Sequence, residues 1–173
     1  VEDCSTDSSR KLLKKYKENE NIKIFYNKEN RGLSYSRNYG LKKSTGDFIG
    51  YIDSDDYVEP DYYEKLMRSS KDNKSDIAIC DIKLVDEQTN KIQRCKCYTN
   101  DFDVCSVINN GFAASACNKL FKRKNIEKYP FAEGKVNEDI AVVIPTLIQA
   151  KKISYADTWY FYVQRRGSIQ NSR

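Results

Sequence analysis

Histidine is absent from all 173 residues of the chain. Because histidine supplies the base in Ser-His and Cys-His mechanisms and is a common metal ligand, its absence excludes those mechanisms. Any general base must then be a carboxylate, a lysine, a tyrosine or a cysteine. The six cysteines form no C-x-x-C pair, so the sequence favours reduced, mostly buried thiols over a zinc site or a redox motif.

Long apolar runs and glycine-rich phosphate-binding motifs are missing as well. No run is long enough for a membrane-spanning helix, and residues 1–4 have neither the basic nor the apolar region of a signal peptide. The sequence therefore predicts a cytoplasmic protein. Neither G-x-G-x-x-G nor G-x-x-x-x-G-K-[ST] occurs, which argues against dinucleotide and P-loop phosphate binding.

The composition that remains is typical of a folded domain, with 39% hydrophobic and 32% charged residues. No repeat or linker divides the chain, so residues 1–173 are expected to form a single domain. The net charge of +5 comes largely from dispersed lysines. Since no aromatic-basic signature accompanies this charge, nucleic acid is not an expected partner, whereas polyanionic ligands and an anionic membrane surface are compatible with it.

The order of predicted elements indicates the fold class. Helices are expected at about 7–19, 34–43 and from 59–61 onward, and they alternate with short strands at 22–26 and 48–52. The second half predicts a hairpin of 76–85 with 92–98, a short helix near 104–109, a strand near 116–121, a helix near 138–150 and an extended segment at 153–163. We therefore expect an α/β fold with a mostly parallel, Rossmann-like sheet flanked by helices, and a smaller antiparallel portion in the second half.

Three carboxylates stand directly after the apolar segment 48–52: Asp53, Asp55 and Asp56. Like charges this close are costly unless a cation, a donor-rich ligand or water compensates them. The cluster is therefore either a solvated loop that caps the next helix or a site for a divalent metal. Ligands bind at the carboxyl ends of strands in open α/β sheets, and residues 1–3 and the loop after residue 26 are expected at the same edge, which favours the site.

The kind of metal follows from the residues around these carboxylates. Tyr57 and Val58 stand where a calcium-binding EF-hand loop needs an oxygen ligand and a glycine, so a calcium loop is excluded. Mg²⁺ or Mn²⁺, held by one or two carboxylates together with substrate phosphates, fits better. The sequence thus implies a diphosphate ligand.

Three arginines, at two places in the sequence, are candidates for binding that anion. Arg37 lies about one turn into the predicted helix 34–43, either near the acidic cluster or on the surface. Arg165 and Arg166 form either a phosphate clamp or a basic tail. For the general base, Asp139 begins an almost entirely apolar helix that is expected to be buried. Its carboxylate either complements the helix dipole or acts as the base.

Six ordered motifs resemble the inverting family 2 glycosyltransferases with the GT-A fold, particularly the bacterial enzymes of capsular and exopolysaccharide assembly. Three of them look like V-D-D-G-S-T-D, N-x-G-x-x-x-A-R-N-x-G and G-x-[YF]-[IL]-x-[FY]-[LI]-D-S-D-D, and they cover residues 1–7, 30–40 and 46–56. The others are the segments 118–123, 137–139 and 160–169, so the resemblance spans essentially the whole chain.

The resemblance implies a role for each matching residue. Asp3 is expected to contact the nucleotide base, Arg37 the base or the diphosphate, and Asp53 and Asp55 form the D-x-D pair. Asp55 or Asp56 is expected to bind Mn²⁺ or Mg²⁺, Arg166 to bind the nucleotide sugar, and Asp139 to take the proton of the acceptor hydroxyl.

The resemblance also implies a division of the domain, with residues 1–60 as the nucleotide-sugar-binding half and residues 61–173 as the acceptor-side half. The implied substrates are a nucleotide-sugar donor, with UDP favoured, and a glycan or lipid-linked acceptor. Peripheral association with the inner face of the membrane and homo-oligomer formation are left open.

The sequence departs from the family pattern in two ways, by substitutions in the first motif and by the residues that precede it in the family. Cys4 stands where the family has glycine, and Glu2 stands where it has the first aspartate. The family also has about thirty residues before this point, and they supply a first strand and helix. We therefore expect a truncated domain that binds nucleotide sugars weakly unless another chain or a rearranged sheet fills the gap. The alternative functions are a non-catalytic nucleotide- or carbohydrate-binding module and, less favoured, a polyanion binder.

Overall fold

A computed structural model describes residues 1–97, 112, 114–135 and 137–165, and the statements below concern these residues. The helices are α1 (Ser9–Leu13), the 3₁₀ helix η1 (Lys14–Tyr16), α2 (Gly32–Lys43), α3 (Tyr62–Asn73), α5 (Arg123–Ile126) and α6 (Ile140–Gln149). The strands are β1 (Phe48–Gly50), β2 (Tyr57–Val58), β3 (Ile77–Asp86), β4 (Ile92–Cys95), β5 (Lys119–Lys122) and β6 (Ile153–Gln164).

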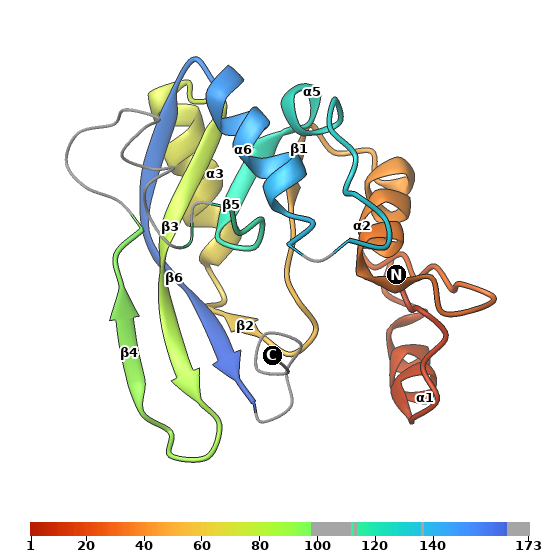
Figure 1. The fold of residues 1–173 in the computed structure, drawn as a ribbon. Helices are drawn as coiled ribbons and strands as arrows, with labels where there is room; N and C mark the ends of the chain where they lie inside the picture. Colours follow the sequence, from red (N-terminus) through yellow and green to blue (C-terminus); the bar gives the residue numbers. More distant parts are fainter. Residues whose placement is uncertain (98–111, 113, 136, 166–173) are drawn as a thin grey trace.

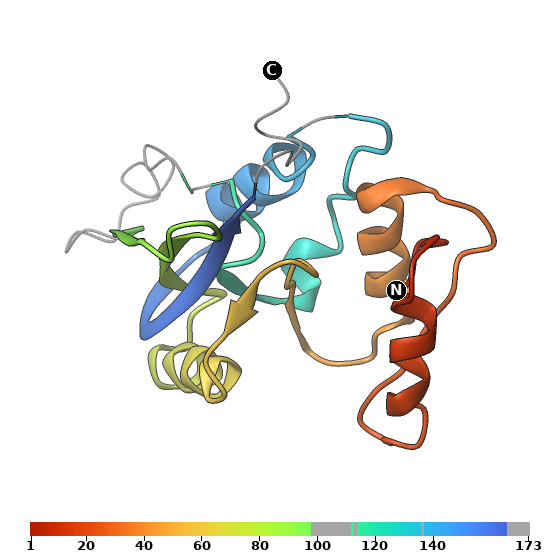
Figure 2. The ribbon, with the colours of Figure 1, turned by 90° about the horizontal axis from the view of Figure 1, so that it is seen from below.

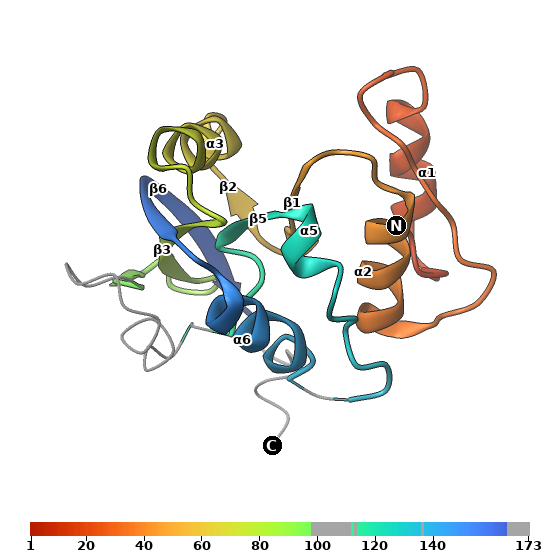
Figure 3. The same ribbon diagram turned by 90° about the horizontal axis from the view of Figure 1, so that it is seen from above.

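One sheet organises the chain, with the strand order β1-β5-β3-β6-β2 and with β4 paired to β3 (Figure 1). Helices α3 and α6 lie on opposite faces of this sheet (Figures 2 and 3). Helix α2 lies beyond the β1 end of the sheet, and α1 lies still farther from it. The α/β class is therefore confirmed, with helices on both sides of a mixed sheet.

The directions of the strands refine the expected topology. The longest pair, β3 with β6, is parallel, as expected for the core of this fold class. The other four pairs are antiparallel, so antiparallel pairing is not confined to a small portion of the second half. One reason is that β5 runs back between β1 and β3 and buries Leu120 and Phe121 there, which makes β1 part of the antiparallel region.

The predicted strand at 22–26 is wrong. Only a single parallel bridge, between Glu2 and Tyr26, forms there. The Glu2 amide donates to the Phe25 carbonyl at 2.8 Å, and the Asn27 amide donates to the Glu2 carbonyl at 2.9 Å. Ile22 remains 39% exposed, so this segment lacks the apolar neighbour that would extend the pairing.

The helices over the sheet follow from their apolar spacing. Helix α3 buries Tyr62, Leu66 and Ser70, which recur every four residues and so share one face. Helix α6 buries Val142, Val143, Thr146 and Leu147 against the sheet. The burial expected for this helix does not extend to its outer face, where Ile140 and Ile148 are 51% and 62% exposed. No described helix has the length and apolarity needed to cross a membrane. The short helix expected near 104–109 lies outside the described residues.

Candidate functional site

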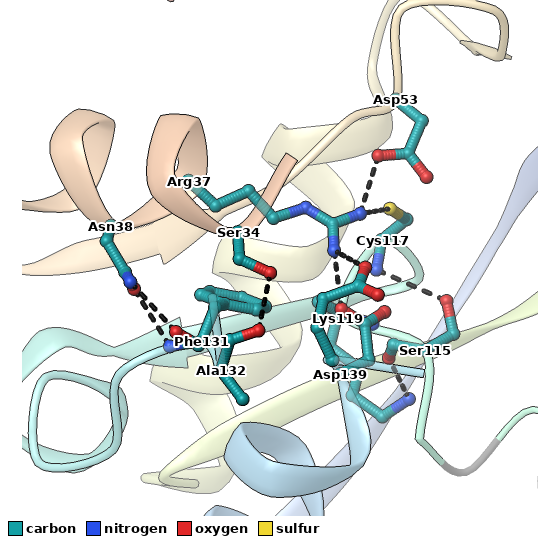
Figure 4. A network of polar contacts seen from close by, with 12 residues as sticks. Ser34, Arg37, Asn38, Asp53, Ser115, Cys117, Lys119, Phe131, Ala132 and Asp139 are labelled. Atoms are coloured by element: carbon teal, nitrogen blue, oxygen red, sulfur yellow. Dashed lines mark hydrogen bonds and ion pairs between the residues drawn. The ribbon is translucent and has the colours of Figure 1, made fainter. Parts of the chain in front are cut away.

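Arg37 joins three parts of the chain that are far apart in sequence (Figure 4). Its guanidinium donates to Asp53 at 2.7 Å, to Glu138 at 2.8 Å and to Asp139 at 2.5 Å. The Arg37 side chain is only 7% exposed, and its guanidinium carbon lies 5.2 Å from the centre of the Phe131 ring. The interpretation of Arg37 as an ordinary surface arginine is therefore wrong. We call Arg37, Asp53, Glu138 and Asp139 the arginine cluster.

Asp139 occupies the position before the first residue of α6, and both of its carboxylate oxygens have partners. One oxygen accepts from Arg37, and the other accepts from the Ala116 amide at 3.0 Å. Burial raises the pKa of Asp139 above its ordinary value, although the positive charge of Arg37 opposes the shift. An aspartate with a raised pKa is a stronger proton acceptor than an ordinary one, which suits a general base.

The acidic loop after β1 is held against β6 by its own carboxylates. Asp56 accepts from the Tyr160 hydroxyl at 2.6 Å and from the Val163 amide at 2.8 Å. Asp55 contacts the guanidinium of Arg165. Burial raises the pKa of Asp56 even though these hydrogen bonds oppose the rise. Each carboxylate thus has a donor within the protein, so the solvated-loop interpretation does not describe Asp56.

The hydrogen bonds and ion pairs of the acidic loop decide which of its carboxylates could bind a metal ion. The described residues contain no group of three or more Cys, Asp or Glu side chains arranged to hold one. Both Asp56 oxygens already accept hydrogen bonds from β6. The Asp55 side chain is 34% exposed, and its partner Arg165 is 47% exposed, so Asp55 is the carboxylate that an ion from solvent reaches most directly. One carboxylate combined with phosphate oxygens is a donor set that suits Mg²⁺ or Mn²⁺.

Asp3 lies beside the start of α2 and accepts hydrogen bonds there. It accepts from the side-chain amide of Asn27 at 2.7 Å and from the backbone amides of Arg31 and Gly32 at 2.8 and 2.7 Å. Burial alone would raise the pKa of Asp3, but these hydrogen bonds outweigh it and place the pKa below its ordinary value. Asp3 therefore caps α2. A nucleotide base that contacts Asp3 would have to use the carboxylate lone pairs that do not take part in these hydrogen bonds.

Of the two C-terminal arginines predicted as candidates, Arg165 is described by the structure. Arg165 reaches the acidic loop, which argues against a free basic tail at that residue. Arg166 lies outside the described residues. Sequence reasoning missed Glu138 as a partner of Arg37, although its position beside Asp139 was a signal. It also missed the Tyr160 hydroxyl, which accepts from the Asp53 amide at 3.2 Å, because nothing local links residues so far apart.

A pocket of about 460 Å³ lies between α2 and β1, next to the arginine cluster. Arg37 and Asp53 are among its lining residues, together with Ser36, Tyr51 and Ser54. Small-ligand pockets typically occupy about 300–1,000 Å³, so the volume is ordinary for such a site. The cluster thus borders an open space, although its charged groups are largely buried.

Comparison with known proteins identifies the family. A model described as "Glycosyl transferase family 2" matches residues 1–130. Glycosyltransferase GlyA of Streptococcus pneumoniae is 31% identical over 98% of this chain, and the poly(ribitol-phosphate) beta-glucosyltransferase of Bacillus spizizenii is 31% identical over 96%. This chain spans 26% and 27% of the lengths of those two proteins.

A solved structure shows the same fold. The crystal structure of Staphylococcus aureus TarS residues 1–349 in complex with UDP-GlcNAc superposes with a TM-score of 0.77. The match covers 99% of this chain and 50% of that one, at 20% sequence identity. At this identity the likeness establishes the fold alone. The family model covers most of the chain and the relatives extend over nearly all of it, so this chain belongs to glycosyl transferase family 2.

Proposed function

We propose that this chain is the catalytic domain of an enzyme that transfers a sugar from a UDP-sugar to a glycan or lipid-linked acceptor in cell-surface polysaccharide synthesis. The relatives named above support the reaction class, and TarS, crystallised with UDP-GlcNAc, supports the type of donor. The observation that carries the proposal is Arg37, which joins Asp53 of the acidic loop to Asp139 of α6. Residues 1–60 would hold the donor, and residues 61–173 would complete the acceptor side.

The arginine cluster suits a single displacement with inversion. Asp139 would accept the proton of the acceptor hydroxyl as that oxygen attacks the anomeric carbon of the donor sugar. The bond from that carbon to the diphosphate would break at the same time, and the nucleoside diphosphate would leave with the electron pair. Arg37 would stabilise the charge that develops on the leaving group, because a guanidinium binds phosphate oxygens well. Asp3 is proposed to contact the base, and Arg166 to contact the donor.

The charge balance of the site supports a divalent cation. One guanidinium faces three carboxylates in the arginine cluster, so the cluster is net negative before a diphosphate arrives. We propose that Asp55, with Asp56 as a second candidate, binds Mn²⁺ or Mg²⁺. A bound ion would neutralise diphosphate charge as the leaving group departs. Cytoplasmic location, peripheral membrane association and oligomer formation stay predictions.

The Asp139→Asn variant tests this function. It keeps the shape of the side chain but removes its basicity, so transfer or hydrolysis of UDP-GlcNAc or UDP-glucose with Mn²⁺ should fall about 10³-fold. UDP binding should change little, because Asp139 acts on the acceptor. In the protein with Asp139 intact, activity should fall as the pH drops through the raised pKa of Asp139, since the base must be ionised.

The matched control is Asp72→Asn, which makes the same change at an exposed position of α3. It should leave both activity and UDP binding unchanged. Full transfer by the folded Asp139→Asn variant would refute Asp139 as the base. UDP binding without turnover in the protein that retains Asp139 would instead favour the non-catalytic binding module.

A further inference from the structure

Lys119 on β5 is buried at 1% exposure, yet within the described part of the chain it makes no ion pair. Its ammonium group instead donates to three oxygens: the Ser115 carbonyl at 2.7 Å, the Asn118 side chain at 2.8 Å and the Phe112 carbonyl at 3.3 Å. A buried ammonium is costly unless its donors are satisfied, and here all three hydrogens have acceptors. The sequence motif that contains Lys119 has no part in the mechanism proposed above.

The contact with Ser115 leads directly to Asp139 (Figure 4). The Ser115 carbonyl and the Ala116 amide belong to one peptide unit, and none of the described peptide bonds is cis. In a planar trans peptide the C=O and N–H groups point in opposite directions. Lys119 therefore binds one side of this peptide, and Asp139 accepts from the other side at 3.0 Å. A positive charge on the carbonyl side polarises the peptide and strengthens its N–H as a donor.

Neighbouring bonds hold the same segment in place. The Ser115 hydroxyl accepts from the Cys117 amide at 3.3 Å, and the Asn118 side chain donates to the Cys80 carbonyl of β3 at 2.8 Å. Lys119 thus connects the central sheet to the peptide that holds Asp139. Without the ammonium group, the Asn118 side-chain oxygen and the Ser115 carbonyl would lose this donor. The Ser115–Ala116 peptide would then lose the contact that fixes its orientation.

We propose that Lys119 positions Asp139. Lys119 does so by orienting and polarising the Ser115–Ala116 peptide, whose amide binds the Asp139 carboxylate. The geometric part of this proposal stands on the contacts alone, and its catalytic consequence rests on the proposed function. Lys119 touches neither donor nor acceptor in this account. Its effect should therefore appear in kcat and in the behaviour of Asp139, and not in the affinity for UDP.

The charge state of Lys119 provides a way to observe the link. Burial lowers the pKa of Lys119 to about 8, although Cys97, Cys80, Asp139 and Cys117, which face it, oppose the shift. Burial raises the pKa of the Cys80 and Cys97 thiols to about 12, and that of the Cys117 thiol as well. Between pH 7 and about 10 these thiols stay protonated. Lys119 is then the one group of this set whose charge changes, and its neutral amine donates at most two hydrogen bonds.

Nuclear magnetic resonance of the Ala116 amide tests the proposal without any assumption about turnover. In the unmodified protein its amide proton should shift twice with pH: once at acidic pH as Asp139 ionises, and again near pH 8 as Lys119 loses its proton. The acidic transition should be absent from Asp139→Asn, which assigns it. An Ala116 resonance that shows no transition between pH 7 and 10 would overturn the proposal, and this arm needs no Lys119 variant.

The Lys119→Met variant tests the catalytic consequence. Methionine keeps an unbranched apolar chain but removes the donors, so the Ala116 amide should no longer follow the ionisation of Asp139. The kcat with UDP-GlcNAc or UDP-glucose should fall about ten-fold or more, because small displacements of a reacting group are expensive. The donor KM should stay within about two-fold of its value in the unmodified protein, because Lys119 does not contribute to donor binding. If this variant fails to fold, Lys119→Gln, which keeps two N–H donors, should give an intermediate loss.

Lys122→Met is the matched control, since it removes a lysine from the same strand whose ammonium pairs with Asp76 at 3.2 Å, away from Asp139. It should leave kcat and the Ala116 titration unchanged. Wild-type kcat in folded Lys119→Met or Lys119→Gln, or an Ala116 amide that still follows Asp139 in either, would contradict the proposal. Full activity of Asp139→Asn would instead refute Asp139 as the base, while the resonance measurements would still decide whether Lys119 positions Asp139.

Discussion

At the scale of single residues, the main feature is the unequal charge around Arg37. One guanidinium serves three carboxylates, and the Arg37 and Asp139 side chains are 7% and 19% exposed. Removing one partner of such a buried group leaves uncompensated charge, which is more damaging than the loss of a surface pair. The sequence predicted Asp53 and Asp139 from local motifs, and their convergence is confirmed by these contacts. Their roles in the reaction remain proposals.

Cys4 is one of the described non-glycine residues whose φ is positive. Its φ of 60° lies in the left-handed region, which a side chain disfavours and glycine adopts freely. The Cys4→Gly variant should therefore raise the free energy of unfolding by about 1 kcal/mol, because relief of strain outweighs the larger entropy of the unfolded chain. Urea denaturation measures this difference.

The same substitution in β4 provides the comparison. Cys95 lies in a strand and has no positive φ, so Cys95→Gly should destabilise the protein. A Cys4→Gly variant that is no more stable than the parent protein would show that the Cys4 conformation carries no strain. The sequence had marked this position, because Cys4 stands where the resembling family has glycine.

At the scale of elements, the structure separates what local patterns predict from what they miss. Helix α3 and the β3–β4 hairpin were predictable, because their apolar spacing and turn residues lie within one short window. The two-residue strand β2 and the four-residue α5 are too short to show a period. The insertion of β5 between β1 and β3 depends on contacts that are non-local in sequence, so the antiparallel pairing of β1 was missed.

The start of α2 gives the prediction at this scale. Asp3 satisfies the Arg31 and Gly32 amides, which have no partner inside the helix. Asp3→Ala should therefore lower the free energy of unfolding by about 1–2 kcal/mol near neutral pH. The loss should shrink in acid: the pKa of Asp3 is lowered in the folded state, so its stabilising contribution is present above its ordinary pKa and disappears as the pH falls through the folded value.

Asp7 provides the control for this prediction, because its carboxylate is exposed and its partner is the nearby Ser9, whose amide donates to it at 2.9 Å. Asp7→Ala should cost clearly less than Asp3→Ala. Equal losses at the two positions, measured by urea denaturation at pH 7, would contradict the assignment of Asp3 as the cap of α2.

At the scale of the whole molecule, the sheet brings the two halves of the sequence to one site. Arg37 and Asp53 come from α2 and the end of β1, whereas Asp139 comes from the start of α6 and is held by the peptide before β5. Local motifs predicted both groups, but only the fold shows that a single arginine joins them. Glu138, Tyr160 and Lys119 were not predicted as site residues, because their importance depends on neighbours from distant parts of the chain.

The stereochemistry of the product tests the central claim most directly. A single displacement with Asp139 as the base inverts the anomeric carbon, whereas two successive displacements retain its configuration. With UDP-GlcNAc or UDP-glucose, whose sugars are α-linked, as the donor, proton nuclear magnetic resonance of the first product formed should show a β-linked sugar. An α-linked product would contradict the account.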